Sequence, residues 1–342
     1  MTSPWAVAID IGASKIAGAL VDATGTMREH RVRPTPTNSA VDDLVWPELG
    51  GLIDDLRGVA PGPLVGVGIG SAGPLDLVAG TVSPVNIPAW RRFPLVDQVS
   101  RHARLPVRLA GDGICAAVGE HWLGAARGVD DVIVIVVSTG VGGGIIQRGR
   151  LHQGRSGNAG HVGHMVVDLD GDDCPCGGRG CVEAMSSGPS MVAWALRQGW
   201  RPGSPDVPPA TVGDAAPPVV GPPGVSPSAV DLAAAARAGD VIARAAFGRA
   251  ARSLAAGITS VAAAADLTHA VIGGGVAAAA DLLLPPLRVA IAEYARLEFV
   301  RQLSVGVAEL GGAAGLYGAA ALIHDPARYG GAAVPASSGE QR

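Results

Sequence analysis

The chain has 342 residues, of which 48% are hydrophobic and 16% charged, and its 26 basic and 30 acidic residues give a formal net charge of −4. This length suggests two domains, and the hydrophobic content excludes a wholly disordered chain. The mild negative charge gives no support for a nucleic-acid or anionic membrane surface, so neither partner is expected. The 50 glycines follow no collagen period, and they indicate tight turns or places where backbone approaches a ligand.

The opening residues carry no basic segment before an apolar run, so no signal peptide is predicted. The longest apolar windows, such as residues 132–137, are shorter than the roughly 20 residues that a membrane helix needs. We therefore expect a cytoplasmic protein without a membrane partner.

The N-terminal third alternates strand and turn signals. Apolar stretches joined by short turns predict antiparallel strands over residues 5–9, 16–21 and 27–32. The spacing of apolar residues then predicts, in chain order, a helix over 41–56, a strand over 64–69, a helix over 94–103 and a strand over 107–110. Strands followed by alternating helices and strands predict an α/β layer arrangement.

The second half repeats this opening weakly, which suggests two related halves. It predicts a buried strand over 131–138, a glycine turn over 139–144 and a strand over 145–147. Residues 201–228 are rich in Pro and Gly, which predicts a loop or partly disordered insertion. Later segments predict two alanine-rich helices over 229–265, a strand running into a glycine turn over 270–276, and a disordered tail over 329–342.

Three glycine turns follow apolar strands, and glycine lets backbone N–H groups come close to phosphate oxygens. A single turn of this kind is more often an ordinary hairpin, but three in this order favour a nucleotide site. Asp10 is expected to hold Mg²⁺ directly or through water, while Ser14, Lys15 and Thr139 meet phosphate oxygens. The spacing matches neither a P-loop nor a dinucleotide fingerprint. The candidate nucleotide-binding residues are Asp10, Gly12, Ser14, Lys15, Thr139, Gly140, Gly142, Gly143, Gly273, Gly274 and Gly275.

His164, Cys174, Cys176 and Cys181 lie close together in the sequence. Three thiolates and one imidazole fit a closed tetrahedral zinc site, which is structural because no position stays open for water. The alternative is three reduced surface thiols. His161 lies three residues before His164 and is a fifth candidate ligand, but we expect it to face the cleft instead.

Four motifs resemble those of the ROK family (repressors, open reading frames and sugar kinases). They are DIGASK at 10–15, STGVGGG at 138–144, GHVGH at 160–164 and CPCGGRGCVE at 174–183. The resemblance extends from Val7 to about Ile323 and implies a two-domain, actin-like (ribonuclease-H-like) ATPase fold of the α/β class, with the active site between the domains. It also implies ATP and Mg²⁺ as cofactors, structural Zn²⁺ and a homodimer.

The expected smaller lobe comprises residues 1–120 with a C-terminal helix at about 312–328, and the larger lobe comprises residues 121–311. Repressor members of the family carry an N-terminal helix-turn-helix domain. This chain starts directly at the first phosphate strand, which favours the kinase branch.

Asp112 is the candidate catalytic base, because transfer of a phosphoryl group to a sugar hydroxyl needs a base beside the attacking oxygen. It ends a predicted strand and begins a helix-like run, so a simple helix N-cap is the alternative. The resemblance favours the base, since Asp112 matches the Asp of the family's Asn-Asp-Ala-Asn pattern.

The resemblance places Gly73, Asn86, His164 and Glu183 around the sugar, with one His164 nitrogen on zinc and the other on a hydroxyl. The alternative for Glu183 is a solvated carboxylate or one that supports the zinc ligands.

Two positions depart from the family pattern. Gly111 stands at the family's Asn, and His161 stands at its Glu, where an imidazole can either donate or accept a hydrogen bond. Bacterial N-acetylmannosamine kinases of the family are similar at His161. We therefore expect an ATP-dependent kinase for the 6-hydroxyl of a hexose or aminohexose, with the N-acetylmannosamine type favoured. The alternatives are a kinase for glucose or for an aminosugar such as kanosamine, and a non-catalytic sugar-sensing protein.

Overall fold

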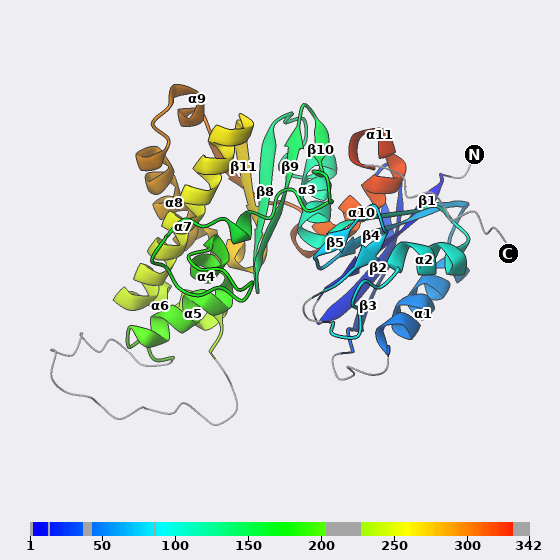
Figure 1. Cartoon of the computed structure of the whole chain (residues 1–342), viewed down its shortest axis with the longest axis horizontal. Coiled ribbons are helices and arrows are strands. Elements are labelled where there is room, and N and C mark those ends of the chain that lie inside the picture. Colours follow the sequence, from blue (N-terminus) through cyan, green and yellow to red (C-terminus); the bar gives the residue numbers. More distant parts are fainter. Residues whose placement is uncertain (1–2, 13, 37–42, 85–86, 203–226, 331–342) are drawn as a thin grey trace.

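The computed structural model describes residues 3–12, 14–36, 43–84, 87–202 and 227–330. Two five-stranded sheets dominate it, with helices between them and on their outer faces (Figure 1). The first sheet has the order β3-β2-β1-β4-β7, in which β1, β4 and β7 are parallel and β2 and β3 are antiparallel neighbours. Its strands are β1 Trp5–Ile11, β2 Lys15–Asp22, β3 Met27–Pro34, β4 Leu64–Ser71 and β7 Val107–Gly111.

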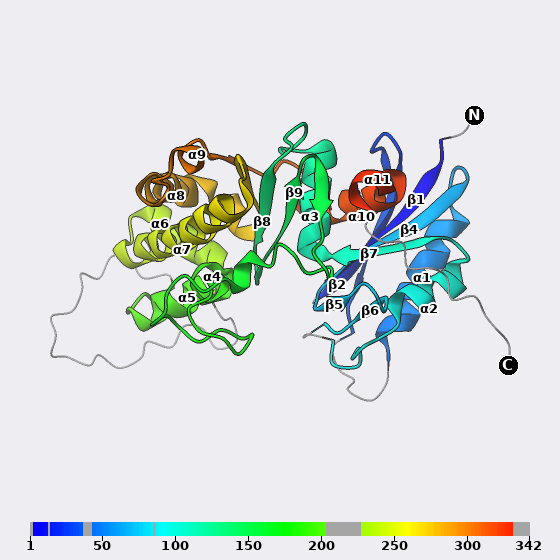
Figure 2. The same cartoon turned by 45° about the horizontal axis from the view of Figure 1, so that its top comes forward.

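Helices α1 (Val45–Gly58) and α2 (Leu95–Ala103) cover the outer face of the first sheet (Figure 2). On α1, Leu49, Leu52 and Leu56 are fully buried at helical spacing and belong to one core with the strands. A short hairpin of β5 (Leu75–Asp76) and β6 (Thr81–Val82) follows β4. The N-terminal part of the chain is thus a layered α/β unit, as its sequence predicts.

The second sheet has the order β10-β9-β8-β11-β12. Its strands are β8 Val132–Val137, β9 Val141–Gln147, β10 Arg150–His152, β11 His269–Gly273 and β12 Ser304–Val307. Helices of the second half share a large core with this sheet. They are α4 Val182–Ser186, α5 Gly188–Arg197, α6 Ala229–Ala238, α7 Val241–Ala265, α8 Ala280–Tyr294 and α9 Glu298–Arg301, with short 3₁₀ turns η1 Val162–His164 and η2 Gly275–Ala279.

Two helices, α3 (Asp112–Leu123) and α10 (Ala314–His324), pack on each other between the sheets (Figure 1). α10 lies against β1 and β4, and α3 lies against β8 and β9. Small residues permit the close approach of α3 and α10, since a Cβ on Gly119 or Gly318 would overlap the backbone of the opposite helix. The last short helices, η3 (Gly311–Ala313) and α11 (Pro326–Tyr329), flank α10.

The buried carboxylate of Glu120 joins the two segments by which the chain crosses between the sheets. It accepts hydrogen bonds from the backbone N–H groups of Ala125 (2.9 Å), Glu309 (3.1 Å) and Leu310 (2.8 Å). Ala125 lies between α3 and β8, whereas Glu309 and Leu310 lie between β12 and α10. One side chain therefore ties both crossings to the C-terminal end of α3.

The structure changes the bounds of two predicted elements. The helix predicted over 41–56 begins at Val45 and ends at Gly58, and the second glycine turn is shorter than predicted. The glycine turn expected over 139–144 ends at Gly140, and β9 begins at Val141, so Gly142 and Gly143 lie inside a strand paired with β8. A Cβ on Gly143 would lie 2.6 Å from the Val134 carbonyl oxygen of β8, so packing requires glycine there, whereas a Cβ on Gly142 would make only ordinary contact with Gly113 of α3. Most of the predicted 201–228 insertion and nearly all of the predicted tail lie outside the described residues.

One stretch, Gly275–Tyr294, has the length and mean hydropathy (1.5) of a membrane span, although the longest apolar windows predicted none. Length and composition alone are weak evidence, because core helices pass the same test. In α8, Leu283, Leu287 and Ile291 are buried in the core shared with α7.

Candidate active site

Asp10 and Asp112 lie at one edge of the first sheet. β1, β4 and β7 are parallel, and Asp10 pairs in register with Gly70, which pairs with Ala110. Two residues after Ala110, Asp112 is the first residue of α3, and its Oδ1 accepts a hydrogen bond from the Gly113 N–H at 2.7 Å. The parallel register therefore brings two carboxylates, 102 positions apart in sequence, to the same edge.

Both carboxyl groups have raised pKa values. The pKa of Asp10 is about 6, against an ordinary value of 3.8. Burial and the nearby Asp112 charge raise it, whereas Lys15 lowers it. Asp112 is accessible to solvent, but the surrounding protein reduces its hydration and raises its pKa. The Gly113 hydrogen bond and the nearby His161 act against that rise. Paired carboxyl groups with raised pKa values are typical of catalytic sites.

His161 reaches the same region from the second half of the chain. Its Nδ1 lies 3.1 Å from the carbonyl oxygen of Asn158. A carbonyl only accepts, so Nδ1 donates and Nε2 is left as an acceptor in the neutral ring. That Nε2 lies 3.8 Å from the position that a Cβ on Gly73 would occupy. His161 therefore lies near both Gly73 and Asp112.

Glu183, in the first turn of α4, supports the turn between β8 and β9. Its Oε2 accepts the Val141 N–H at 2.7 Å, and the same oxygen fills the place that a side chain on Gly140 would take. Among the described residues, Oε1 has no hydrogen-bond partner. Glu183 can thus hold the turn with one oxygen and present the other to a ligand.

A cavity of about 610 Å³ opens beside the second and third glycine turns. Its wall includes Ser138, Thr139 and Gly275, and the Ser138 carbonyl accepts the N–H of Gly188 at the start of α5 (2.8 Å). Gly274 has a φ of 87°, and a Cβ there would overlap the backbone of Val137. The two turns are therefore packed against each other, which explains why one cavity reaches both.

Most of the wall of this cavity was missed by the sequence analysis. It comes from α5, α6, α7 and η2, whose contributions are mainly small or apolar: Gly188, Pro189, Val192, Ala193, Leu196, Ala229, Val230, Ala233, Arg237, Phe247, Val276, Ala278 and Ala279. Apolar residues at helical spacing predict a core equally well, so no local signal distinguishes them.

The first turn lies between β1 and β2. The Gly12 N–H donates to the Lys15 carbonyl (2.9 Å), while the Thr35 hydroxyl donates to the Gly12 carbonyl (3.0 Å). Ser14 and Lys15 are exposed. This turn therefore lies beside Asp10 and is not among the residues that line the large cavity.

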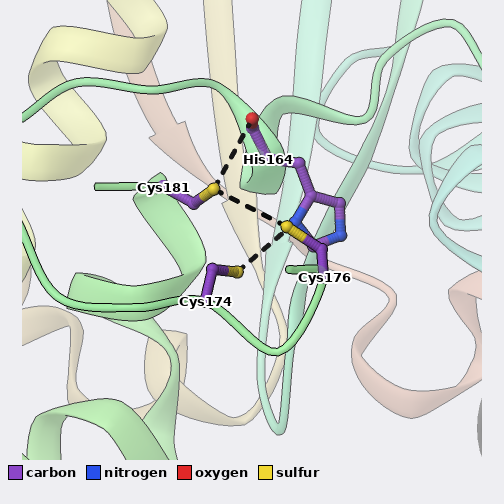
Figure 3. Close-up of side chains that lie close together, drawn as sticks. All are labelled: His164, Cys174, Cys176 and Cys181. Carbon is purple, nitrogen blue, oxygen red and sulfur yellow. Dashed lines mark hydrogen bonds between the residues drawn. The ribbon is translucent and has the colours of Figure 1, made fainter. Parts of the chain in front are cut away.

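The four predicted metal ligands form one cluster (Figure 3). The ligand atoms of His164, Cys174, Cys176 and Cys181 all lie within 4.8 Å of one another. Cys176 Sγ is 3.9 Å from Cys181 Sγ, and Cys174 Sγ is 3.8 Å from His164 Nδ1. Sulfurs at about 2.3 Å from a tetrahedral zinc would be about 3.8 Å apart, so the donor set and its spacing fit zinc.

The ring of His164 also lies close to that of His161, with centroids 6.2 Å apart and planes 23° apart. His164 Nδ1 faces the sulfurs, which leaves Nε2 for another partner. The metal cluster and the His161 site are therefore adjacent.

Gly111 is the last residue of β7, with extended backbone (φ −64°, ψ 150°). A Cβ built there would meet Ile114 side-chain atoms at 3.6–3.9 Å, which is ordinary van der Waals contact. Neither strain nor crowding requires glycine at this position. Asn86, the remaining predicted sugar-binding residue, lies outside the described residues.

Two sheets around the α3–α10 pair, with an acidic edge and a nucleotide-sized cavity, define the two-domain actin-like ATPase fold. The chain belongs to the ROK family, whose model matches residues 6–326.

Known relatives cover nearly the whole chain. The chain is 32% identical over 337 residues to the glucokinase of Thermotoga maritima, which spans 95% of this chain and 98% of that protein. It is 40% identical over 190 residues to the N-acetylmannosamine kinase of Citrobacter koseri, but this match covers 55% of this chain and 63% of that protein. The structure is similar to a ROK family glucokinase from Streptomyces griseus in complex with glucose and AMPPNP. That match has a TM-score of 0.75 and 33% identity and covers 93% and 99% of the two chains.

Proposed function

We propose that the chain is an ATP-dependent kinase that phosphorylates the 6-hydroxyl of a hexose or aminohexose, with Asp112 as the general base. The observation that carries this proposal is the position of the Asp112 carboxyl, which lies at the start of α3, accessible to solvent and close to Asp10 and His161. Membership of a family with glucokinase and N-acetylmannosamine kinase relatives supports it.

In this proposal Asp112 takes the proton of the sugar 6-hydroxyl as that oxygen attacks the γ-phosphorus. The bond from the γ-phosphorus to the β–γ bridging oxygen breaks, and ADP leaves. A carboxyl with a raised pKa is a stronger proton acceptor once ionised, which suits the role of base. The exposed position of the carboxyl allows a sugar hydroxyl to reach it.

The cavity beside Ser138, Thr139 and Gly275 is proposed to hold the nucleoside of ATP. The phosphates would then extend past the Ser138–Gly140 turn toward the first turn, where Lys15 carries a positive charge. Mg²⁺, when bound, would neutralise phosphate charge, and Asp10 is the carboxylate placed to hold it or its waters. The pKa of Asp10 is raised because burial and the Asp112 charge disfavour its ionised form, and a bound cation would favour that form.

Zinc is proposed at His164, Cys174, Cys176 and Cys181 as a structural ion. Four protein ligands close its coordination, so it would position His164 and the neighbouring His161 and take no part in phosphoryl transfer.

The sugar site is proposed to comprise Gly73, Asn86, Gly111, Asp112, His161, His164 and Glu183. His161 Nε2 accepts hydrogen bonds in the neutral ring, so it suits a hydroxyl or the N–H of a 2-acylamino group. This favours an N-acetylmannosamine-type substrate. Glucose is supported equally by the relatives, and the absent side chain at Gly111 leaves space for a substituted sugar such as kanosamine.

We also propose a cytoplasmic homodimer.

A coupled ADP-release assay with glucose, mannose, N-acetylmannosamine, N-acetylglucosamine and kanosamine tests the proposal. One sugar is expected to exceed the others in kcat/KM, with phosphate on its 6-hydroxyl by NMR. Absence of ATP turnover with every sugar, in folded and zinc-loaded protein, would contradict a kinase and favour the sugar-sensing alternative.

A further inference from the structure

The chain segment that leaves β4 reaches across to the second half of the protein. Residues 73–77, here the sugar-side arm, follow the C-terminal end of β4, the strand between β1 and β7. The arm therefore starts at the same sheet edge that carries Asp10 and precedes Asp112. Residues 156–161, here the His161 segment, lie between β10 and η1 in the second half of the chain.

One side chain joins the arm to this segment. Asn158 Oδ1 accepts the Leu75 N–H (3.3 Å), and Asn158 Nδ2 donates to the Leu75 carbonyl (2.9 Å). The amide thus satisfies both backbone groups of one residue, as a neighbouring strand would. The Leu77 N–H adds a longer hydrogen bond to the Ser156 carbonyl (3.4 Å).

Packing also holds the sugar-side arm against the His161 segment. Gly157 has a φ of 87°, and a Cβ there would overlap the side chain of Leu77. The arm can therefore approach the His161 segment only where residue 157 is glycine. The backbone carbonyl of Asn158 also accepts the His161 Nδ1–H, so Asn158 contacts His161 with its main chain and Leu75 with its side chain.

We propose that Asn158 is a positioning residue that clamps the sugar-side arm to the His161 segment and so sets the distance between Gly73 and His161 across the bound sugar. This inference rests on the proposed function of the site. The nucleotide cavity has no wall residue from either segment, among the residues that the structure describes. Loss of the clamp should therefore weaken sugar binding and leave ATP binding unchanged.

The test compares Asn158→Ala with Asn158→Asp and the control Ser156→Ala. Ser156→Ala removes a hydroxyl that contacts Asn158 Nδ2 (3.1 Å) but leaves both Asn158–Leu75 bonds in place. In Asn158→Ala we expect KM for the preferred sugar to rise by about tenfold, which corresponds to about 1.4 kcal/mol, with KM for ATP within about twofold of wild type. Asn158→Asp keeps the acceptor but replaces the donor by a second carboxylate oxygen, which would repel the Leu75 carbonyl oxygen, so its sugar KM should rise at least as much as that of Asn158→Ala.

Hydrogen–deuterium exchange of the Leu75 amide provides a readout that does not need activity. Exchange should accelerate in Asn158→Ala and stay at the wild-type rate in Ser156→Ala. Calorimetric titration with glucose and with N-acetylmannosamine, without ATP, should show the same loss of sugar affinity as the KM values.

An unchanged Leu75 exchange rate in Asn158→Ala, an unchanged sugar KM, or equal rises in both KM values would overturn the proposal. If wild-type protein binds sugar but transfers no phosphate, the kinase assignment is contradicted. The role of Asn158 is still tested in that case, because amide exchange and calorimetry do not need activity. Wild-type protein that binds neither sugar would overturn the role in sugar binding.

Discussion

Asp10 and Asp112 are electrostatically coupled across the edge of the first sheet, and the charge of Asp112 helps to raise the pKa of Asp10 to about 6. The coupling follows from topology: β1 and β7 lie on either side of β4, and their carboxyl ends meet at one edge. Two like charges whose hydration the surrounding protein reduces oppose folding at neutral pH. Retaining them is costly for stability, and a bound cation would offset the cost.

Asp10→Asn is expected to stabilise the protein at pH 8 and to abolish most of the activity. Asp10 has a folded-state pKa of about 6 against an ordinary value of 3.8. Its protonated form therefore adds to the free energy of unfolding fully below about pH 4, and this contribution is lost as the pH rises through about 6. Asn carries no charge at any of these pH values. The free energy of unfolding of Asp10→Asn should exceed that of wild type by about 1–3 kcal/mol at pH 8 and match it at pH 4.

Urea unfolding at both pH values measures this difference, with Asp97→Asn in α2 as the control. Asp97 pairs with Arg101, so its replacement should lower stability slightly at pH 8 instead of raising it. Addition of Mg²⁺ at pH 8 should stabilise wild type more than Asp10→Asn. Equal stabilisation of the two proteins would place the cation elsewhere.

Gly111→Asn is expected to fold and to shift sugar preference. The position has extended backbone and room for a Cβ, and it is the N-cap of α3, where Asn is preferred to Gly. A new amide beside Asp112 should contact a sugar hydroxyl. The ratio of kcat/KM for glucose to kcat/KM for the preferred sugar should therefore change by about two- to tenfold. Steady-state kinetics on the sugar panel checks this. Gly111→Ala is the matched control, because it adds the Cβ without the amide; an identical effect of both variants would show that bulk alone matters.

Removal of the metal is expected to destabilise the protein. Purified protein should contain one zinc per chain by mass spectrometry, and Cys174→Ser should lose it. A loss of roughly 3 kcal/mol would lower Tm by about 4 °C, because the unfolding entropy of a chain of this length is about 0.7 kcal/mol/K. Cys115→Ala is the control, since Cys115 is buried in the core beside α10, away from the cluster, and should keep its zinc. Full zinc content in Cys174→Ser would contradict the proposed ligand set.

Local patterns were sufficient to predict the first three strands, both outer helices and the start of α3. Each depends on neighbours in sequence: apolar alternation for the strands, helical spacing for α1, and a strand that ends at Gly111 just before a helical run for Asp112. The metal cluster was equally predictable, because closely spaced cysteines need only local wrapping to meet.

The remaining features depend on contacts between distant segments. Gly142 and Gly143 have the composition of a phosphate turn, but α3 packs on them and they form part of β9. The wall of the cavity proposed for the nucleoside comes from apolar helix faces that cannot be distinguished from core in sequence. The Asn158–Leu75 contact spans 83 positions, and nothing near either residue indicates it.

The central claim is that Asp112 is the base, and Asp112→Asn tests it most directly. Asn keeps the size of the side chain but cannot take the proton, so kcat should fall by about 10²–10⁴-fold while sugar binding and zinc content stay near those of wild type. Tm should not fall, because the substitution also removes the repulsion between Asp112 and Asp10. In wild type, kcat/KM should decline on acidification at a higher pH than for an ordinary carboxyl, because the pKa of Asp112 is raised. Wild-type turnover by folded, zinc-loaded Asp112→Asn would contradict the account.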